Sequence, residues 1–183
     1  LARSFFFLLY QFLNHKYDQV EVVFISHSTQ AKRVDEDDFF RVGTHGGTIV
    51  SSCLDLELDI IQKEYHPNSW NIYSFYCGDG ENWTSDNEKC IDLFSQIKDV
   101  SQLTGYCEIN EHYKGLADEV DPNDPFQGTP WGTFSAWKNE EMENLWSKLN
   151  PLCDNKFKKV MVGQPEHIWK AFHSLFGGKS THE

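Results

Sequence analysis

The chain has 183 residues and a formal net charge of −12, and its composition is 39% hydrophobic and 15% aromatic. This length and this share of apolar residues predict one folded domain and exclude an intrinsically disordered chain. The acidic charge repels phosphate backbones and argues against nucleic-acid binding, whereas a cation or a basic protein surface fits it as a partner.

The cysteine pattern indicates a reducing compartment, and we expect a cytoplasmic protein. The number of cysteines is odd and no C-x-x-C pair occurs, which argues against a disulfide framework and a zinc knuckle. The apolar run Phe5–Leu13 is far shorter than the ~20 residues that a membrane-spanning helix needs, so we expect no membrane association. The five cysteines are Cys53, Cys77, Cys90, Cys107 and Cys153.

The first part of the chain alternates helical and strand-like patterns. Residues 2–16 are rich in Phe and Leu and predict a buried helix, and the β-branched run within 19–26 predicts an interior strand. A second strand is expected over 29–34, followed by an acidic helix start or loop at 35–38. Residues 49–65 carry apolar side chains on a wide face, which predicts a helix.

The same alternation continues to the end of the chain and predicts an α/β fold. Strands that alternate with helices favour a mostly parallel sheet with helices on both faces. We expect a single domain over 1–176 and a tail over 177–183. Such a fold usually opens on a strand, so its first strand is expected to be missing here. The further predicted elements are strands at 70–77, 103–109 and 157–162, helices at 87–100, 138–149 and 165–176, and a long loop at 110–136.

Three segments are candidates for a binding site, because doubly wound sheets bind ligands at the carboxyl ends of their strands. They are residues 26–28, the glycine-rich loop 43–48 and residues 78–82. Within them, Thr48 and Asp79 offer a hydroxyl and a carboxylate, which are oxygen ligands of the kind that Mg²⁺ prefers. Each also has a simpler interpretation: Thr48 as a helix N-cap, and Asp79 with its following glycine as a turn.

Two of these segments carry a resemblance to a known fold. Gly46-Gly47-Thr48 before a helix, and a strand that ends in Asp79-Gly80, resemble the second and third elements of the von Willebrand factor A metal-ion-dependent adhesion site. More narrowly, the chain resembles the YhbH/YeaH-type family of bacterial proteins, which is associated with sporulation and stress. The segments that carry this resemblance are 3–6, 22–27, 46–48 with 51–52, 70–73 and, most specifically, 79–87.

The resemblance implies a von Willebrand factor A-like domain in which Thr48 and Asp79 are metal ligands for Mg²⁺ in the intact protein. The open position on the metal would accept a carboxylate from a protein partner, and the family implies a PrkA-type AAA serine kinase as that partner. The first element of the adhesion site, Asp-x-Ser-x-Ser, does not occur in these 183 residues. We expect it before Leu1, and we expect metal binding by this fragment to be weak or absent.

Three functional hypotheses follow. The first is a non-catalytic protein-interaction module with a partial metal site. The second is a metal-dependent hydrolase that uses Asp79 and His27, although a hydrogen-bonded structural histidine is the simpler interpretation of His27. The third is a structural interaction protein without metal. The glycine-rich loop is not a phosphate-binding P-loop, because no Gly-Lys-Ser/Thr follows it, and Cys77 without a partner histidine fits a core thiol better than a nucleophile.

Overall fold

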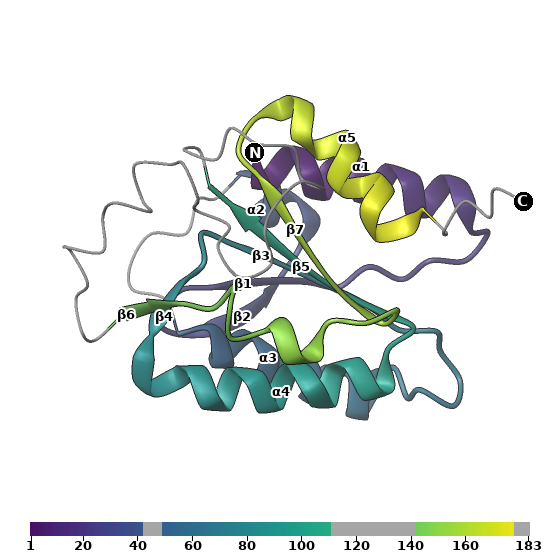
Figure 1. Cartoon of the computed structure of the whole chain (residues 1–183). Helices are drawn as coiled ribbons and strands as arrows, with labels where there is room; N and C mark the ends of the chain where they lie inside the picture. Colours follow the sequence, from purple (N-terminus) through teal and green to yellow (C-terminus); the bar gives the residue numbers. More distant parts are fainter. Residues whose placement is uncertain (42–48, 111–141, 178–183) are drawn as a thin grey trace, which may run out of the picture.

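The computed structural model describes residues 1–41, 49–110 and 142–177, in which helices and strands alternate along the chain (Figure 1). The helices are α1 (Ala2–Lys16), α2 (Glu36–Arg41), α3 (Val50–Glu64), α4 (Asn87–Val100) and α5 (Pro165–Phe176). The strands are β1 (Phe24–His27), β2 (Ala31–Val34), β3 (Tyr73–Gly78), β4 (Glu81–Trp83), β5 (Leu103–Ile109), β6 (Met142–Asn144) and β7 (Phe157–Val162). Short 3₁₀ turns span Thr84–Asp86 and Asn150–Leu152.

A parallel sheet in the order β3-β5-β7 forms the centre of the molecule. Helices α3 and α4 cover one face of this sheet, and α1 and α5 cover the other (Figure 1). The helix α4 is the crossover between β3 and β5, which is the connection that parallel neighbours require. The predicted α/β class, with a parallel sheet between two helical layers, is therefore confirmed.

Alternation along the strands divides the core into two clusters. The central strand β5 is buried from Leu103 to Glu108, as expected for a strand covered on both faces. Tyr106 belongs to the cluster under α3 and α4, and its neighbour Cys107 belongs to the cluster under α1 and α5. Successive side chains of a strand point to opposite faces, so the side chains of β5 pack alternately against the α3–α4 layer and the α1–α5 layer.

The prediction of an interior strand over 19–26 is wrong in its bounds and in its pairing. The strand is β1, which begins only at Phe24, and it pairs antiparallel with β2 rather than with the parallel sheet. All four of its residues are partly exposed. The β-branched run favours extended backbone, but such a preference does not determine which strand the segment pairs with. The strand expected over 29–34 is confirmed as β2.

The predicted helix over 138–149 is wrong in its described part. Residues 142–144 form β6, which pairs antiparallel with β4, and turns follow. Leu145, Trp146 and Leu149 are buried in the cluster under α3 and α4, so packing outweighs the helical propensity of the Glu-rich sequence. The remainder of this prediction, the loop expected at 110–136 beyond Asn110 and most of the tail lie outside the described residues.

The other predicted elements agree with the structure, and α1, α4, β5, β7 and α5 have the predicted bounds. The helix over 2–16 was predicted to be buried, but only Phe5 and Leu9 of α1 are buried, because the helix covers one face of the sheet and leaves its other side exposed. None of the five cysteines forms a disulfide. Among the described residues, no helix combines the length and the apolar character that crossing a membrane requires.

Candidate binding site at the carboxyl edge of the sheet

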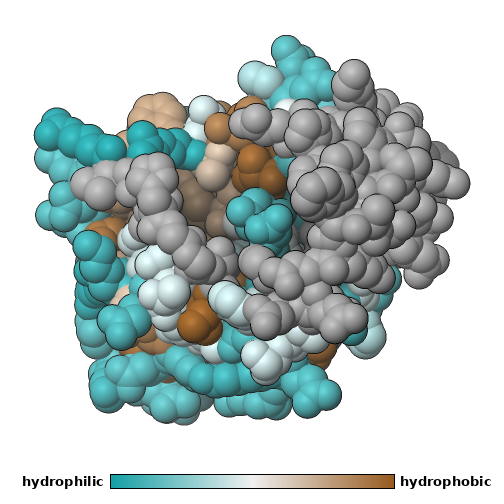
Figure 2. All heavy atoms as spheres, turned by 90° about the vertical axis from the view of Figure 1, so that its left-hand side faces the viewer, coloured by the Kyte–Doolittle hydropathy of each residue, from teal (hydrophilic) through white to brown (hydrophobic). Residues whose placement is uncertain are grey.

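The three parallel strands end side by side, at Gly78, Ile109 and Val162. We call this side of the molecule, on the left of Figure 1, the carboxyl edge. Figure 2 looks directly at it and shows polar residues around a few exposed apolar ones. Ligands of open α/β sheets bind at this edge, so a binding site of this domain is expected here.

Asp79 directly follows β3 and is exposed. Its Oδ1 accepts a hydrogen bond from the backbone N–H of Glu81 at 3.2 Å, and Gly80 has a φ of 85°, a conformation that favours glycine. The turn expected from the Asp-Gly dipeptide is therefore confirmed. This turn leads directly into β4.

His27 ends β1 and lies beside β3. Its ring packs against the ring of Tyr76, with 5.5 Å between the centroids. Burial lowers the pKa of His27, and the backbone of Ser28 and the charge of Asp79 oppose this shift. His27 and Asp79 therefore lie within electrostatic range, although no hydrogen bond or ion pair joins them. The Nδ1 atom of His27 is buried and has no hydrogen-bond partner among the described residues.

Thr48, the other predicted metal ligand, lies outside the described residues. The chain is described again from Ile49, whose backbone N–H donates to the carbonyl oxygen of Ser28 at 3.0 Å. The next N–H, that of Val50, donates to Oδ1 of Asn82 at 3.1 Å. The start of α3 therefore contacts both the residue that follows β1 and the β4 strand, which begins two residues after Asp79.

Asn82, within the candidate segment 78–82, and Asp86 are functional candidates that the sequence pattern did not single out. Asn82 is fully buried. Asp86 accepts a hydrogen bond from the N–H of Ser51 at 3.0 Å and one from the thiol of Cys90 at 3.1 Å. Both side chains reach back more than thirty residues to the first turn of α3. Both residues belong to segment 79–87, which carries the most specific part of the family resemblance. The sequence of this segment alone does not reveal which helix the two side chains contact.

Hydrogen bonds control the ionisation of Asp86. Partial burial of its carboxyl group acts to raise its pKa. Hydrogen bonds from the side chain and backbone of Ser51, and then from Cys90 and Asn82, together outweigh this effect, so the pKa of Asp86 is lower than usual. Asp86 is thus held as a carboxylate, which strengthens the bonds that it accepts.

A buried polar group lies at the end of the central strand. Glu108 is fully buried, and Oε2 of its carboxyl group accepts a hydrogen bond from the Tyr106 hydroxyl at 3.4 Å. Tyr106 stacks on Tyr76 with 5.4 Å between centroids. Burial, followed by nearby ionisable groups that include Asp79, raises the pKa of both tyrosines well above its usual value. They are therefore neutral hydroxyls, able to donate and to accept hydrogen bonds.

The described part of the carboxyl edge supplies one of the two predicted metal ligands. No group of three or more His, Cys, Asp or Glu side chains within residues 1–41, 49–110 and 142–177 is arranged to hold a metal ion. A carboxylate is a suitable ligand for Mg²⁺, but one carboxylate does not make an octahedral site. These residues alone therefore do not fit a magnesium ion.

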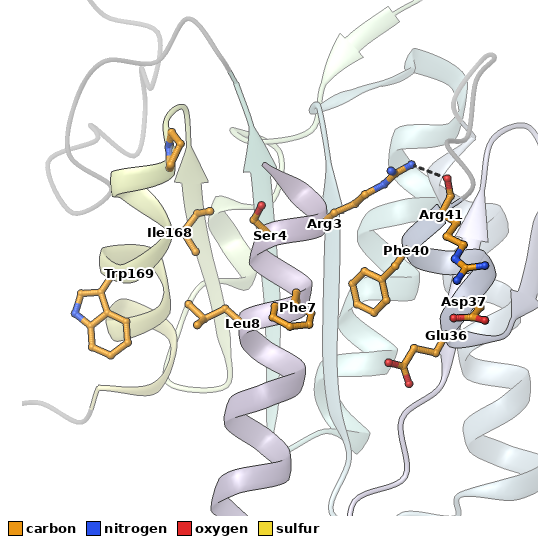
Figure 3. Close-up of a pocket in the computed structure, with 11 residues that line it drawn as sticks. Arg3, Ser4, Phe7, Leu8, Glu36, Asp37, Phe40, Arg41, Ile168 and Trp169 are labelled. Carbon is orange, nitrogen blue, oxygen red and sulfur yellow. Dashed lines mark hydrogen bonds between the residues drawn. The ribbon is translucent and has the colours of Figure 1, made fainter.

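An open cleft of about 710 Å³ lies between α1, α2 and α5 (Figure 3). Its apolar lining includes Phe7 and Phe40, whose rings meet edge to face at 6.2 Å. Trp169 at its rim is 66% exposed. At one side the Arg3 guanidinium donates to the backbone oxygen of Arg41 at 3.4 Å. No sequence motif indicated this cleft.

The fold and this edge define an α/β domain with a candidate binding site at the carboxyl ends of its parallel strands. The family that matches residues 1–179 is described as "Protein of unknown function (DUF444)", and the chain belongs to this family. The sequence resemblance to the YhbH/YeaH-type bacterial proteins is thereby confirmed.

Bacterial relatives share this family. The chain is 51% identical over 178 residues to a "UPF0229 protein" of Oceanobacillus iheyensis, a match that covers 96% of the chain and 38% of the relative. It is 42% identical over 159 residues to one of Ruminiclostridium cellulolyticum, with 87% and 40% covered. The chain thus spans about two fifths of these relatives. No solved structure matches it.

Proposed function

We propose that this chain is the larger part of a von Willebrand factor A-like, non-catalytic protein-interaction module that binds its partner through the carboxyl edge. In the full-length protein, Thr48 and Asp79 act as ligands of a Mg²⁺ ion, and a further strand outside these 183 residues completes the sheet and the adhesion site. The observation that supports this proposal is the contact between the start of α3, which begins two residues after Thr48, and β4, which begins two residues after Asp79.

The partner and setting follow from the family resemblance. We infer a cytoplasmic protein that acts with a PrkA-type AAA serine kinase in bacterial sporulation or stress response. The partner would supply a carboxylate to the open position on the metal, since a hard cation accepts such a ligand. The acidic charge of the chain fits the binding of a cation.

One observation favours the alternative of a metal-dependent hydrolase. His27 is partly buried, its pKa is lowered by that burial, and it lies within the electrostatic range of Asp79, which are properties of a general base. No direct hydrogen bond orients His27 toward Asp79, so the interaction module is the better supported function. A metal-free structural protein is the third possibility, and metal uptake separates it from the other two.

The test is calorimetry with Mg²⁺ on the full-length protein. The proposal predicts binding that Asp79→Ala abolishes. Asp59→Ala is the matched control, because Asp59 is an exposed carboxylate of α3 that pairs with Lys63, and it should leave binding unchanged. Binding that survives Asp79→Ala would exclude Asp79 as a ligand, and no uptake by the unmodified protein would favour the metal-free alternative.

A further inference from the structure

The backbone N–H groups in the first turn of α3 donate hydrogen bonds to side chains from a distant part of the sequence. The first N–H groups of any helix have no partner within it, and the N-cap residue Ile49 makes no side-chain hydrogen bond to them. Asn82 accepts the N–H of Val50, and Asp86 accepts the N–H of Ser51. Both acceptors come from the segment that joins β3 to α4. The segment that begins with Asp79 therefore holds the start of α3.

The acceptors are themselves held in place. The Nδ2 atom of Asn82 donates to Oδ1 of Asn87 at 3.0 Å and to the sulfur of Cys90 at 3.4 Å. The Cys90 thiol in turn donates to Asp86. Asn82, Asn87 and Cys90 are all buried. A buried network of this kind fixes the geometry of its members, because each lost bond leaves a desolvated polar group.

We propose that Asn82 and Asp86 are positioning residues of the carboxyl edge, which hold the first turn of α3 beside the loop that carries Asp79. This inference rests on the proposed function for its link to metal binding. Groups that orient metal ligands without touching the metal are a general feature of metal sites, and their loss weakens affinity. Here the groups held together come from two segments that are far apart in sequence.

The geometry argues against Asn82 and Asp86 as ligands themselves. Asn82 has no exposed surface, and its oxygen already accepts the Val50 N–H. The Oδ2 atom of Asp86 already accepts two hydrogen bonds. Both side chains therefore act through α3.

The chain offers a matched control for this role. Lys89 of α4 pairs with Asp55 of α3 at 2.5 Å, and both side chains are about half exposed. This pair joins the same two helices as the network, but it does not contact the N–H groups of the first turn. Asp55→Asn therefore removes a link between α3 and α4 without releasing the start of α3.

The experiment combines amide hydrogen exchange with Mg²⁺ calorimetry on the full-length protein. Asp86→Ala should speed exchange at the Ser51 amide, and Asn82→Ala should speed it at Val50. Each should weaken Mg²⁺ affinity by roughly tenfold or more. Asp86→Asn keeps an oxygen acceptor and should retain most of the affinity, and Asp55→Asn should behave like the unmodified protein in both measurements.

Two results would overturn the inference. One is unchanged exchange and affinity in a folded Asp86→Ala or Asn82→Ala variant. The other is a loss in Asp86→Asn as large as that in Asp86→Ala, since this would make the Asp86 carboxylate a ligand. Absence of Mg²⁺ binding in the unmodified protein would contradict the proposed function instead, and the exchange rates at Val50 and Ser51 would still decide the positioning role.

Discussion

The two faces of the central sheet differ in what they bury. The face under α1 and α5 is packed mainly with aliphatic and aromatic side chains such as Phe5, Leu9 and Phe172. The face under α3 and α4 buries aromatic rings together with polar groups, among them Glu108 and Asn82. Burying a polar group is costly unless it is hydrogen-bonded. The face that carries this cost is also the one that continues into the candidate site.

The largest expected effect is that of Phe94→Ala. The Phe94 ring is fully buried and meets the rings of Tyr76, Tyr106 and Phe157 edge to face. Its removal should cost about 3–5 kcal/mol of unfolding free energy, because it leaves a cavity. The measurement is urea denaturation.

Phe172→Ala is the matched variant on the opposite face, where Phe172 packs between Phe12 and Phe176. It should cost a similar amount of stability. Only Phe94→Ala should change the near-ultraviolet circular dichroism of the stacked tyrosine pair, Tyr76 and Tyr106. Equal changes in the tyrosine spectrum of both variants would contradict the claim that the tyrosine pair packs on the face under α3 and α4 alone.

A smaller effect concerns pH. Burial of the Glu57 carboxyl group raises its pKa from 4.5 to about 7, partly opposed by the Ser74 hydroxyl. A raised pKa in the folded state stabilises the protein below the unfolded pKa, and this stabilisation is lost as the pH rises through about 7. The loss should be on the order of 2 kcal/mol between pH of about 5 and about 8.

Glu57→Gln should remove this part of the pH dependence, because a glutamine does not titrate. Denaturation of both proteins at the two pH values provides the measurement. If the unmodified protein and the variant lose stability in parallel, the titration does not belong to Glu57.

The sequence predicted the fold where periodicity is strong and local. The bounds of α4, β5 and α5 follow from apolar patterns within each segment. The sequence-based prediction was wrong where strand pairing determines the structure. The strand β1 pairs with β2 in a hairpin and not with the parallel sheet. Residues 142–144 form β6 in place of a predicted helix, because they pair with β4, which is far away in the sequence. The same limit applies to the site. Asp79 and His27 were visible as residue types at strand ends, whereas the roles of Asn82, Asp86 and Glu108 are apparent only from their contacts.

The most direct test of a cation site at the carboxyl edge uses Mn²⁺, a paramagnetic ion that suits the same oxygen ligands as Mg²⁺. Added in small amounts to the labelled full-length protein, it should broaden the backbone amide signals of Gly78, Gly80 and Ile49 and leave that of Trp169 in α5 sharp. Broadening that spares the first three residues, or that is centred on the acidic residues of α2, would contradict a cation site at this edge.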